Sequence, residues 1–377
     1  MSESLSAIPS GVRYYFGREA HLRRAIEHAA MSIFKAWSYE EITPPSVDYY
    51  SLFERGMGSV EAQDAFRFTD TDGKLLALRP DVTSGIARAA ATLMAKRERP
   101  LRFSYAAPVF RLRAESHAEW RRESTQIGCE LIGRNGCAAD TEVLLIAVEI
   151  LSSLGLDGSY AITINDLEVF NGIVGRLGLD APAQEKLREL VDTHNAGDLE
   201  RFLASYASTE ECASFAQLVK LSGRGEVFQN ARRVITNDRS VTALDRLEAL
   251  WGVIDSLGLS AHFEVDLGDV SRLDYYTGLI FKIYVAGVGM RVGSGGRYDQ
   301  LTANFGKAEP AVGFVLDLDA LAEAMRANES ISRLGEVAER TAALIMDEDP
   351  AVLFREALRK RERGDRVVIN LKRDLIP

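Results

Sequence analysis

The chain has 377 residues and a mass of 41.6 kDa, a length that predicts two or three domains. Hydrophobic residues make up 46% of the chain and charged residues 27%, which excludes the collagen-like, coiled-coil and disordered classes. The net charge of −10 provides no overall attraction for nucleic acid, so we expect the chain to bind none.

The sequence shows no signal for export, for membrane insertion or for the binding of a cofactor. No apolar run reaches the ~20 residues that span a bilayer, and Met1–Gly11 lacks the basic and apolar regions of a secretory signal. The three cysteines are too few for a disulfide scaffold and fit a reducing compartment. No phosphate-binding glycine motif and no metal-ligand spacing occurs. We therefore expect a cytoplasmic protein with no membrane association, no metal and no cofactor.

Hydrophobic spacing predicts the elements of the first half of the chain. A first helix is indicated by apolar residues at helical spacing, namely Leu22, Ile26, Ala29, Ile33 and Phe34. Up to residue 155 we expect a helix over 18–38, a hairpin over 64–79 and a helix over 83–96. Two strands over 101–111 and 125–133 and a helix over 138–155 follow. We expect Thr83 to cap the helix that it begins.

In the second half of the chain the sequence pattern becomes helical and then returns to strand-like segments. Because strand-like aromatic runs disappear, we predict an all-helical insertion with helices at Ala183–Asp192, Leu199–Tyr206 and Val241–Leu257. The elements expected next are strands at His262–Leu267 and Leu279–Val285, then a glycine-rich turn at Gly293–Gly296. A further apolar run at Val312–Leu316 leads into a helix at 318–327. The last segment predicts strand, helix and strand, at Ala342–Met346, Ala351–Glu362 and Arg366–Leu371. Such a unit cannot cover both faces of its own strands, so we expect it to need a partner surface.

The predicted fold class is α+β, a mainly antiparallel sheet flanked by helices. We expect the core to consist of two parts, residues 1–170 and 259–328, with a helical insertion at 171–258 between them. A short C-terminal α/β segment is expected at 329–377.

Two segments carry polar residues that suit a ligand. Asp81 and Thr83 lie where a strand ends and a helix begins, a place that directs side chains into clefts, although such residues also commonly cap helices. Alternation along 125–133 places Gln126 and Glu130 on one strand face, beside Arg111. Carboxylates can hold the ammonium group of an α-amino acid, and an arginine its carboxylate or a phosphate. The alternative is the solvated face of an antiparallel sheet.

Two later segments are weaker signals on their own. Tyr275 and Tyr276 should point to opposite faces of an extended segment, so that one packs and the other presents its hydroxyl to a pocket. Ordinary core aromatics are the alternative. Gly293–Gly296 contains three glycines in four residues, which permits a close approach of a ligand to the backbone, but a flexible hairpin turn has the same composition.

The order and spacing of these segments resemble histidyl-tRNA synthetase, a class II aminoacyl-tRNA synthetase, from about Gly11 to Ala327. The similar segments are Pro44-Pro45 in motif 1, Phe110-Arg111 in motif 2, Leu273–Tyr276 and Gly293–Asp299 in the two histidine-specific segments, and Ala311–Phe314 in motif 3. The resemblance implies a histidine-binding site formed by Asp81, Thr83, Arg111, Gln126, Glu130, Tyr275 and Tyr276.

The departures from the synthetase pattern concentrate at its ATP site. Ala320 stands where motif 3 carries an arginine that holds the ATP phosphates, and Asp317 and Asp319 would repel them. Arg113 stands in place of a motif 2 glutamate, and the loop at 114–122 lacks the family's pattern. The ATP machinery is therefore altered, while most of the histidine pocket is retained.

This combination resembles the regulatory subunits of ATP phosphoribosyltransferase, which are non-catalytic paralogues of histidyl-tRNA synthetase. The resemblance implies a chain with no enzymatic activity of its own that activates the short-form catalytic subunit in the first step of histidine biosynthesis and mediates feedback inhibition by histidine. It also implies a homodimer through the synthetase-like core and a hetero-octamer with the catalytic subunit.

Two alternatives remain open from the sequence. A divergent or truncated histidine-activating ligase would need Arg297 or Arg291 to replace the missing motif 3 arginine. A scaffold that no longer binds histidine would fit the shorter Asp81 and also Ser271, which stands where the family has an arginine, with Arg272 one residue late. A shift of one residue reverses the face of an extended strand.

Overall fold

The computed structural model describes residues 7–112, 121–192, 196–206, 215–270, 275–328, 341–345 and 350–370. The chain divides into two units, Met1–Ser330 and Ile331–Pro377. Among the described residues, no helix combines the length and the apolar character needed to cross a membrane.

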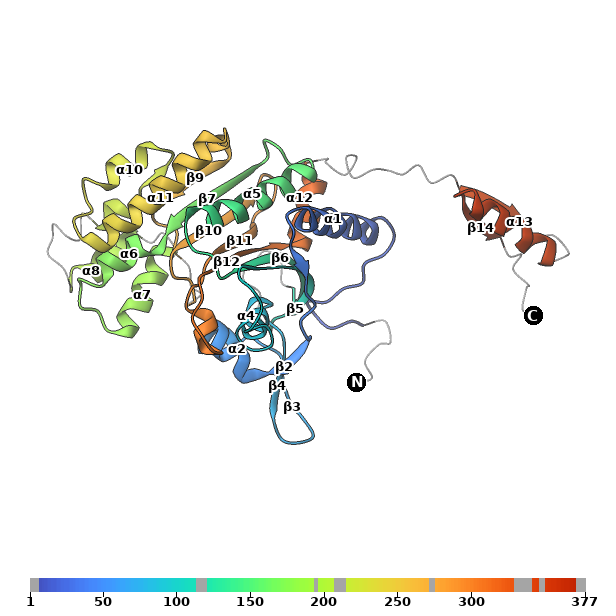
Figure 1. The fold of residues 1–377 in the computed structure, drawn as a ribbon, viewed down its shortest axis with the longest axis horizontal. Coiled ribbons are helices and arrows are strands. Elements are labelled where there is room, and N and C mark those ends of the chain that lie inside the picture. The colour runs from blue at the N-terminus through green and yellow to red at the C-terminus, as the bar shows by residue number, and fades with distance from the viewer. Residues whose placement is uncertain are drawn as a thin grey trace. The chain divides into compact units, whose positions relative to one another are not determined.

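In the described part of the first unit, a nine-stranded sheet forms the centre (Figure 1). In sheet order its strands are β1 (Glu40–Glu41), β5 (Leu101–Phe110), β6 (Glu123–Ile132), β12 (Ala311–Asp317), β11 (Arg291–Arg297), β10 (Leu279–Val285), β7 (Tyr160–Asp166), β9 (Phe263–Asp266) and β8 (Ser222–Gly223). Neighbours pair antiparallel, except for β1 with β5 and β7 with β9. The predicted α+β class with a mainly antiparallel sheet is confirmed.

Helices cover one face of this sheet (Figure 1), among them α1 (Gly17–Ala36), α5 (Cys137–Ser153) and α12 (Leu318–Ala327). The buried residues of α1 are Leu22, Ile26, Ala30, Ile33 and Phe34. The helix predicted over 18–38 is confirmed, although Ala30 rather than Ala29 lies on its buried face. The ring centroid of Phe34 lies 6.0 Å from that of Phe314 in β12, so α1 packs directly on the sheet.

Smaller elements lie on the opposite side of the sheet (Figure 1). They are the helices α2 (Tyr50–Met57), α3 (Ser59–Ala62) and α4 (Thr83–Ala91), the short helix η2 (Leu301–Asn304), and a second sheet of β2 (Val47–Tyr49), β4 (Leu75–Leu78) and β3 (Arg67–Thr69). The pair β3 and β4 is the predicted hairpin. The helix α4 ends at Ala91, not at residue 96, because the Arg99 guanidinium donates to the carbonyls of Ala90 and Met94 and satisfies this end.

A helical region lies between β7 and β9 at one end of the first unit (Figure 1). Its elements are α6 (Leu167–Val174), α7 (Ala181–Asp192), α8 (Ala196–Leu203), α10 (Glu226–Ala231), α11 (Asp238–Ser256) and the short helix η1 (Ser260–His262). The helices predicted here are confirmed, with α8 ending earlier than expected. The prediction that this region is entirely helical is wrong at β8. Its residues pair with the distant strand β9, and this pairing outweighs the local preference for a helix. The boundaries 171–258 stay a prediction.

The glycine-rich segment Gly293–Gly296 is a strand, not the predicted turn. It forms most of β11, which pairs with β10 on one side and β12 on the other. A Cβ atom on Gly295 would lie 2.4 Å from the Phe281 ring and 2.6 Å from the Phe314 side chain. The glycines therefore make room for large neighbours in the middle of the sheet, a role that local composition does not distinguish from a turn.

The second unit contains a strand, a helix and a strand, β13 (Thr341–Ile345), α13 (Pro350–Glu362) and β14 (Arg366–Asn370). The two strands pair parallel, so the predicted order of elements is confirmed over the described residues, and Met346 and Leu371 lie outside them. The helix buries Leu353 and Ala357. The expected partner surface for this unit stays a prediction.

Candidate functional site

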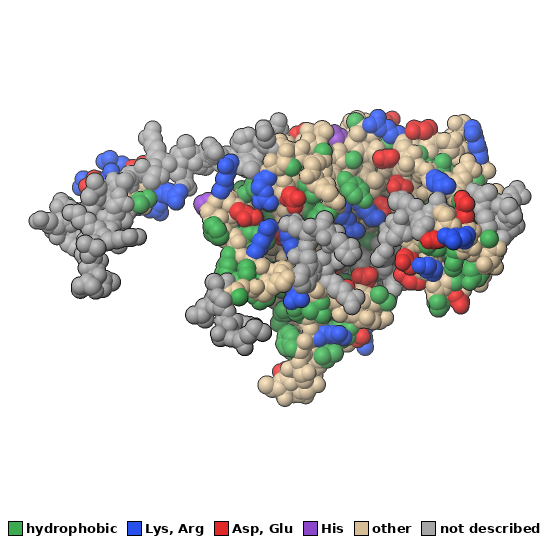
Figure 2. Space-filling model, turned by 180° about the vertical axis from the view of Figure 1, so that it is seen from behind, with side chains coloured by type: hydrophobic (Ala, Val, Ile, Leu, Met, Phe, Trp, Pro, Cys, Tyr) green, Lys and Arg blue, Asp and Glu red, His purple; other side chains and the backbone are tan. Residues whose placement is uncertain are grey.

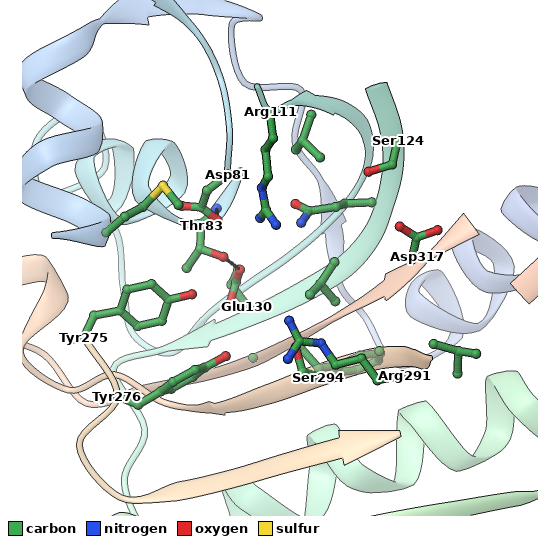
Figure 3. Close-up of a pocket in the computed structure, with 18 of the residues that line it drawn as sticks. Asp81, Thr83, Arg111, Ser124, Glu130, Tyr275, Tyr276, Arg291, Ser294 and Asp317 are labelled. Carbon is green, nitrogen blue, oxygen red and sulfur yellow. Dashed lines mark hydrogen bonds between the residues drawn. The ribbon is translucent and has the colours of Figure 1, made fainter. Parts of the chain in front are cut away.

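All seven sequence-predicted site residues line one cavity of about 160 Å³, as most of them show in Figure 3. They are Asp81, Thr83, Arg111, Gln126, Glu130, Tyr275 and Tyr276. They come from the start of α4, the end of β5, the strand β6 and the segment before β10. The fold therefore brings together residues that are far apart in the chain, whereas their role in binding histidine stays a prediction.

Glu130 forms the floor of this cavity and is only 1% exposed. The Thr83 hydroxyl donates to its carboxylate at 2.7 Å, the Tyr105 hydroxyl donates at 3.4 Å, and the Tyr298 hydroxyl donates to the other oxygen. Burial raises the pKa of Glu130 to about 8, and these hydroxyl bonds only partly oppose that effect. Burial therefore favours the protonated form of the Glu130 carboxyl at neutral pH.

The register of β6 explains why Glu130 and Gln126 share the cavity. Side chains alternate along a strand, so Gln126, Gly128 and Glu130 face one side, while Ile127 and Cys129 are fully buried on the other. A Cβ atom on Gly128 would lie 2.6 Å from the Tyr105 hydroxyl, so this glycine leaves room for the tyrosine that bonds Glu130. The predicted shared face of Gln126 and Glu130 is confirmed.

Asp81 combines the two roles that the sequence left open. Its carboxylate accepts from the main-chain N–H groups of Thr83 at 3.1 Å and Ser84 at 2.9 Å, so it caps α4 while lining the cavity. Thr83 is not a cap, contrary to the prediction, because its hydroxyl instead donates to Glu130. The helix start thus fixes both side chains toward the cavity.

Tyr275 and Tyr276 do not point to opposite faces, so this prediction is wrong. Both line the same cavity (Figure 3), and their ring centroids lie 4.8 Å apart. The alternation rule fails because the pair lies in a turn and loop rather than a strand. Arg113 and Ser271, with Arg272, lie outside the described residues.

The sequence did not single out four further residues of the cavity as ligand-binding residues, namely Arg291, Ser294, Tyr298 and Asp317. Tyr298 carried a signal, because it lies in Gly293–Asp299, one of the two segments that resemble the histidine-specific segments of the synthetase. Arg291 appeared only as a substitute for an ATP-binding arginine. Its place in this cavity depends on how β10 and β11 pair, which the sequence does not show.

A buried ion cluster lies beside the cavity, at the start of α12. The Asp319 carboxylate has no exposed side-chain surface and pairs with Arg23, with Arg121 at 3.2 Å and more loosely with Arg13 at 3.7 Å. The Tyr15 hydroxyl donates to it at 2.6 Å. The adjacent residue Ala320, at the place of the synthetase phosphate-binding arginine, is buried and supplies a main-chain N–H to Asp317. Cations near the expected phosphate position are thus paired with the chain's own carboxylate.

A second cavity contains Arg297, one of the two arginines that the ligase alternative requires. Its guanidinium pairs with Asp140 at 2.7 Å and Asp299 at 3.1 Å. Arg297 does not line the cavity of Glu130. Among the described residues, no group of histidine, cysteine and acidic side chains has the arrangement of a metal site.

The raised pKa of Glu130 predicts a pH dependence of stability. The ordinary pKa of this carboxyl is 4.5, so between pH 4.5 and about pH 8 the folded chain keeps a proton on Glu130 that the unfolded chain has lost. The stability that this proton contributes is therefore complete below pH 4.5 and is lost as the pH rises to about 8. We expect the free energy of unfolding to fall by up to about 1.4 kcal/mol per pH unit in this range. Urea unfolding of the wild type and Glu130→Gln at pH 6 and pH 8 measures it.

The groups that face Glu130 are Asp81, Thr83, Tyr105 and Tyr298. Asp140 titrates with the same sign, since burial raises its pKa to about 6, so the wild type alone is not diagnostic. A smaller pH slope in Glu130→Gln than in the wild type is the expected result. Equal slopes would show that Glu130 is ionised throughout the range.

Comparison with known proteins identifies the family of the chain. The model of the histidyl-tRNA synthetase family matches residues 11–321. The ATP phosphoribosyltransferase regulatory subunit of Moorella thermoacetica is 34% identical over 96% of this chain and 92% of its own length. The regulatory subunit of Acetivibrio thermocellus is 34% identical over 85% of this chain and 76% of its own length.

Solved structures agree with this assignment. A protein of Bacillus halodurans described as an ATP phosphoribosyltransferase regulatory subunit/histidyl-tRNA synthetase superposes with a TM-score of 0.87 at 27% identity, covering 100% of this chain and 96% of that one. Histidyl-tRNA synthetase from Nostoc shares the fold, with a TM-score of 0.80 at 19% identity over 99% of this chain and 88% of that one. The chain therefore belongs to the family of ATP phosphoribosyltransferase regulatory subunits, and its fold is that of the histidyl-tRNA synthetases.

Proposed function

We propose that this chain is the regulatory subunit of an ATP phosphoribosyltransferase in the first step of histidine biosynthesis. It activates a short-form catalytic subunit and transmits feedback inhibition by histidine. The relatives that match nearly the whole chain carry this name, which supports the proposal. The observation that carries the histidine part is the cavity built around Glu130, in which acidic groups, tyrosine hydroxyls and arginines converge.

The cavity matches the chemistry of histidine group by group. Asp81 suits the α-ammonium group, since carboxylates form strong bonds to charged donors. Glu130, with Tyr275 and Tyr276 nearby, suits the imidazole ring, because a mostly protonated carboxyl can donate to a ring nitrogen or lose its proton to it. Arg111 suits an anionic group. A pocket of this kind needs only to bind, not to position a phosphate for reaction.

We further propose that the chain is not itself an enzyme. Ala320 offers no charge to an ATP phosphate, and Arg23 and Arg121 are engaged by Asp319. Of the two arginines that the ligase alternative requires, Arg297 lines a different cavity and Arg291 lines the main one. This arrangement favours a binding role over histidine activation. We expect no histidine-dependent exchange of pyrophosphate into ATP. Exchange above background would instead support the ligase alternative.

The assembly that we propose is a homodimer through the synthetase-like core, which joins the catalytic subunit in a cytoplasmic hetero-octamer. Regulation then requires histidine to bind the active and inhibited assemblies with different affinities, typically by about 1–3 kcal/mol. Light scattering after size exclusion of the mixed subunits tests this. A mass equal to four copies of each chain is expected, and separate elution of the two chains would contradict the proposal.

A further inference from the structure

The segment that precedes α1 presents two aromatic side chains to solvent. Tyr14 is 77% exposed and Phe16 is 80% exposed, more than any other tyrosine, phenylalanine or tryptophan in the described part of the chain. Large aromatic side chains stabilise a protein most when they are buried, and they dominate the energetics of interfaces. Two of them exposed side by side indicate a surface that another molecule covers.

The residue between them faces inward and holds the segment in place. The Tyr15 hydroxyl donates to the buried Asp319 carboxylate at 2.6 Å, and the Arg23 guanidinium carbon lies 3.8 Å from the centre of the Tyr15 ring. Because side chains alternate along an extended chain, this contact directs Tyr14 and Phe16 outward. The aromatic pair is therefore presented by a fixed backbone, which reduces the entropy that binding a partner would cost.

The exposed charged side chains beside the pair are basic. Between residues 13 and 24, arginines are exposed at 13, 18 and 24, whereas the one acidic residue, Glu19, is partly buried and pairs with Arg13 at 3.6 Å. Figure 2 shows blue Lys and Arg side chains next to a purple histidine at the side of the molecule that carries α1. We call Tyr14, Phe16, Arg18 and Arg24 the N-terminal patch.

A second copy of this chain does not suit the N-terminal patch. In a two-fold dimer the same surface of each copy meets the other, so Arg18 and Arg24 would approach the same arginines. Like charges brought together at an interface repel each other. A different protein, with an apolar pocket and an acidic rim, complements both the aromatic and the basic side chains. Tyrosine, phenylalanine and arginine are also the residues enriched in such contacts.

The same segment borders the main cavity. Arg121 pairs with Asp319 at 3.2 Å, and the Arg122 main-chain N–H donates to the Gly11 carbonyl at 2.7 Å. Both arginines also line the cavity of Glu130. A ligand in that cavity and a protein on the N-terminal patch would therefore act on one set of residues, which gives a physical route for coupling between them.

We infer that the N-terminal patch is the surface on which the catalytic subunit docks, with Tyr14 and Phe16 in an apolar pocket and the two arginines against an acidic rim. This inference rests on the proposed function, which supplies the partner, and it adds the surface and the chemistry of the contact. The contact then depends on aromatic burial and, to a smaller extent, on charge.

The concentration of this chain that half-activates the short-form catalytic subunit, without histidine, tests the inference. We expect it to rise at least about 30-fold in the double variant Tyr14→Ser with Phe16→Ser, the loss typical of anchor residues at an interface. Arg18→Glu should raise it at low salt and less at high salt, because salt screens exposed charges. Urea unfolding of the double variant should match the wild type, since both side chains are exposed.

The matched control is the double variant Tyr206→Ser with Leu257→Ser, which removes two exposed apolar side chains from the helical region. It should leave the half-activating concentration unchanged. A wild-type value in the Tyr14 and Phe16 variant would overturn the docking surface while leaving the proposed function intact. A lower mass of that variant alone in light scattering would also overturn it, by assigning the pair to a contact between copies. If the wild type itself does not activate the catalytic subunit, the proposed function fails and the inference with it.

Discussion

Glu130→Gln is expected to weaken inhibition by histidine about 10- to 100-fold while the catalytic subunit is still activated. The substitution keeps the shape of the side chain, but an amide cannot give a proton to the imidazole ring and become charged, as the Glu130 carboxyl can. The amide offers one acceptor oxygen in place of two, whereas Glu130 accepts from Thr83 and Tyr298 at different oxygens. Hydrogen bonds to charged groups contribute about 1.5–3 kcal/mol each, which corresponds to this range of affinity.

Glu123→Gln is the matched control for this prediction. Glu123 begins the same strand, β6, but its side chain is exposed and lies outside the main cavity. The concentration of histidine that halves the rate of the assembled complex should rise in Glu130→Gln and stay constant in Glu123→Gln. Unchanged inhibition in Glu130→Gln would remove Glu130 from the histidine site.

Gly313→Ala is expected to lower the free energy of unfolding by at least about 3 kcal/mol, the upper range for overpacked sites. Gly313 in β12 pairs with Glu130 in β6. An added Cβ atom would lie 1.9 Å from the Glu130 carboxylate and 2.4 Å from the carbonyl oxygen of Cys129. The carboxylate cannot move without losing Tyr298, and the carbonyl belongs to the sheet, so the central strands would have to separate.

Gly252→Ala is the control, since Gly252 lies on the exposed side of α11 and its added Cβ atom would meet no atom within 4 Å. An alanine there should raise the free energy of unfolding by about 0.5–1 kcal/mol, because glycine is unfavourable inside a helix. Urea unfolding of both variants at one pH gives the comparison. Equal stabilities of Gly313→Ala and the wild type would contradict the described packing of β6 against β12.

Local geometry explains which parts of the site could be predicted from the sequence. The alternation of a strand is a local rule, so the shared face of Gln126 and Glu130 followed from their spacing alone. The resemblance to synthetases combined these residues with Asp81, Thr83 and the tyrosines in one site, and the fold brings them into one cavity. Where the rule was applied to a segment that is not a strand, at Tyr275 and Tyr276, it gave the wrong orientation.

Features that depend on distant partners could not be predicted in this way. Three glycines among four residues are typical of a turn, and only the pairing of this segment with β10 and β12 makes it a strand. The cluster around Asp319 joins the N-terminal segment, α1 and the segment before β6, which no spacing reveals. The register shift between β10 and β11 likewise exists only in the pairing of the two strands.

The most direct test of the regulatory role is the formation of phosphoribosyl-ATP by a short-form catalytic subunit. The rate is measured for the catalytic subunit alone and mixed with this chain, each with and without histidine. We predict that mixing raises the rate and that histidine then suppresses it. A rate that this chain leaves unchanged would contradict the regulatory role, and stimulation that histidine does not suppress would contradict the histidine site around Glu130.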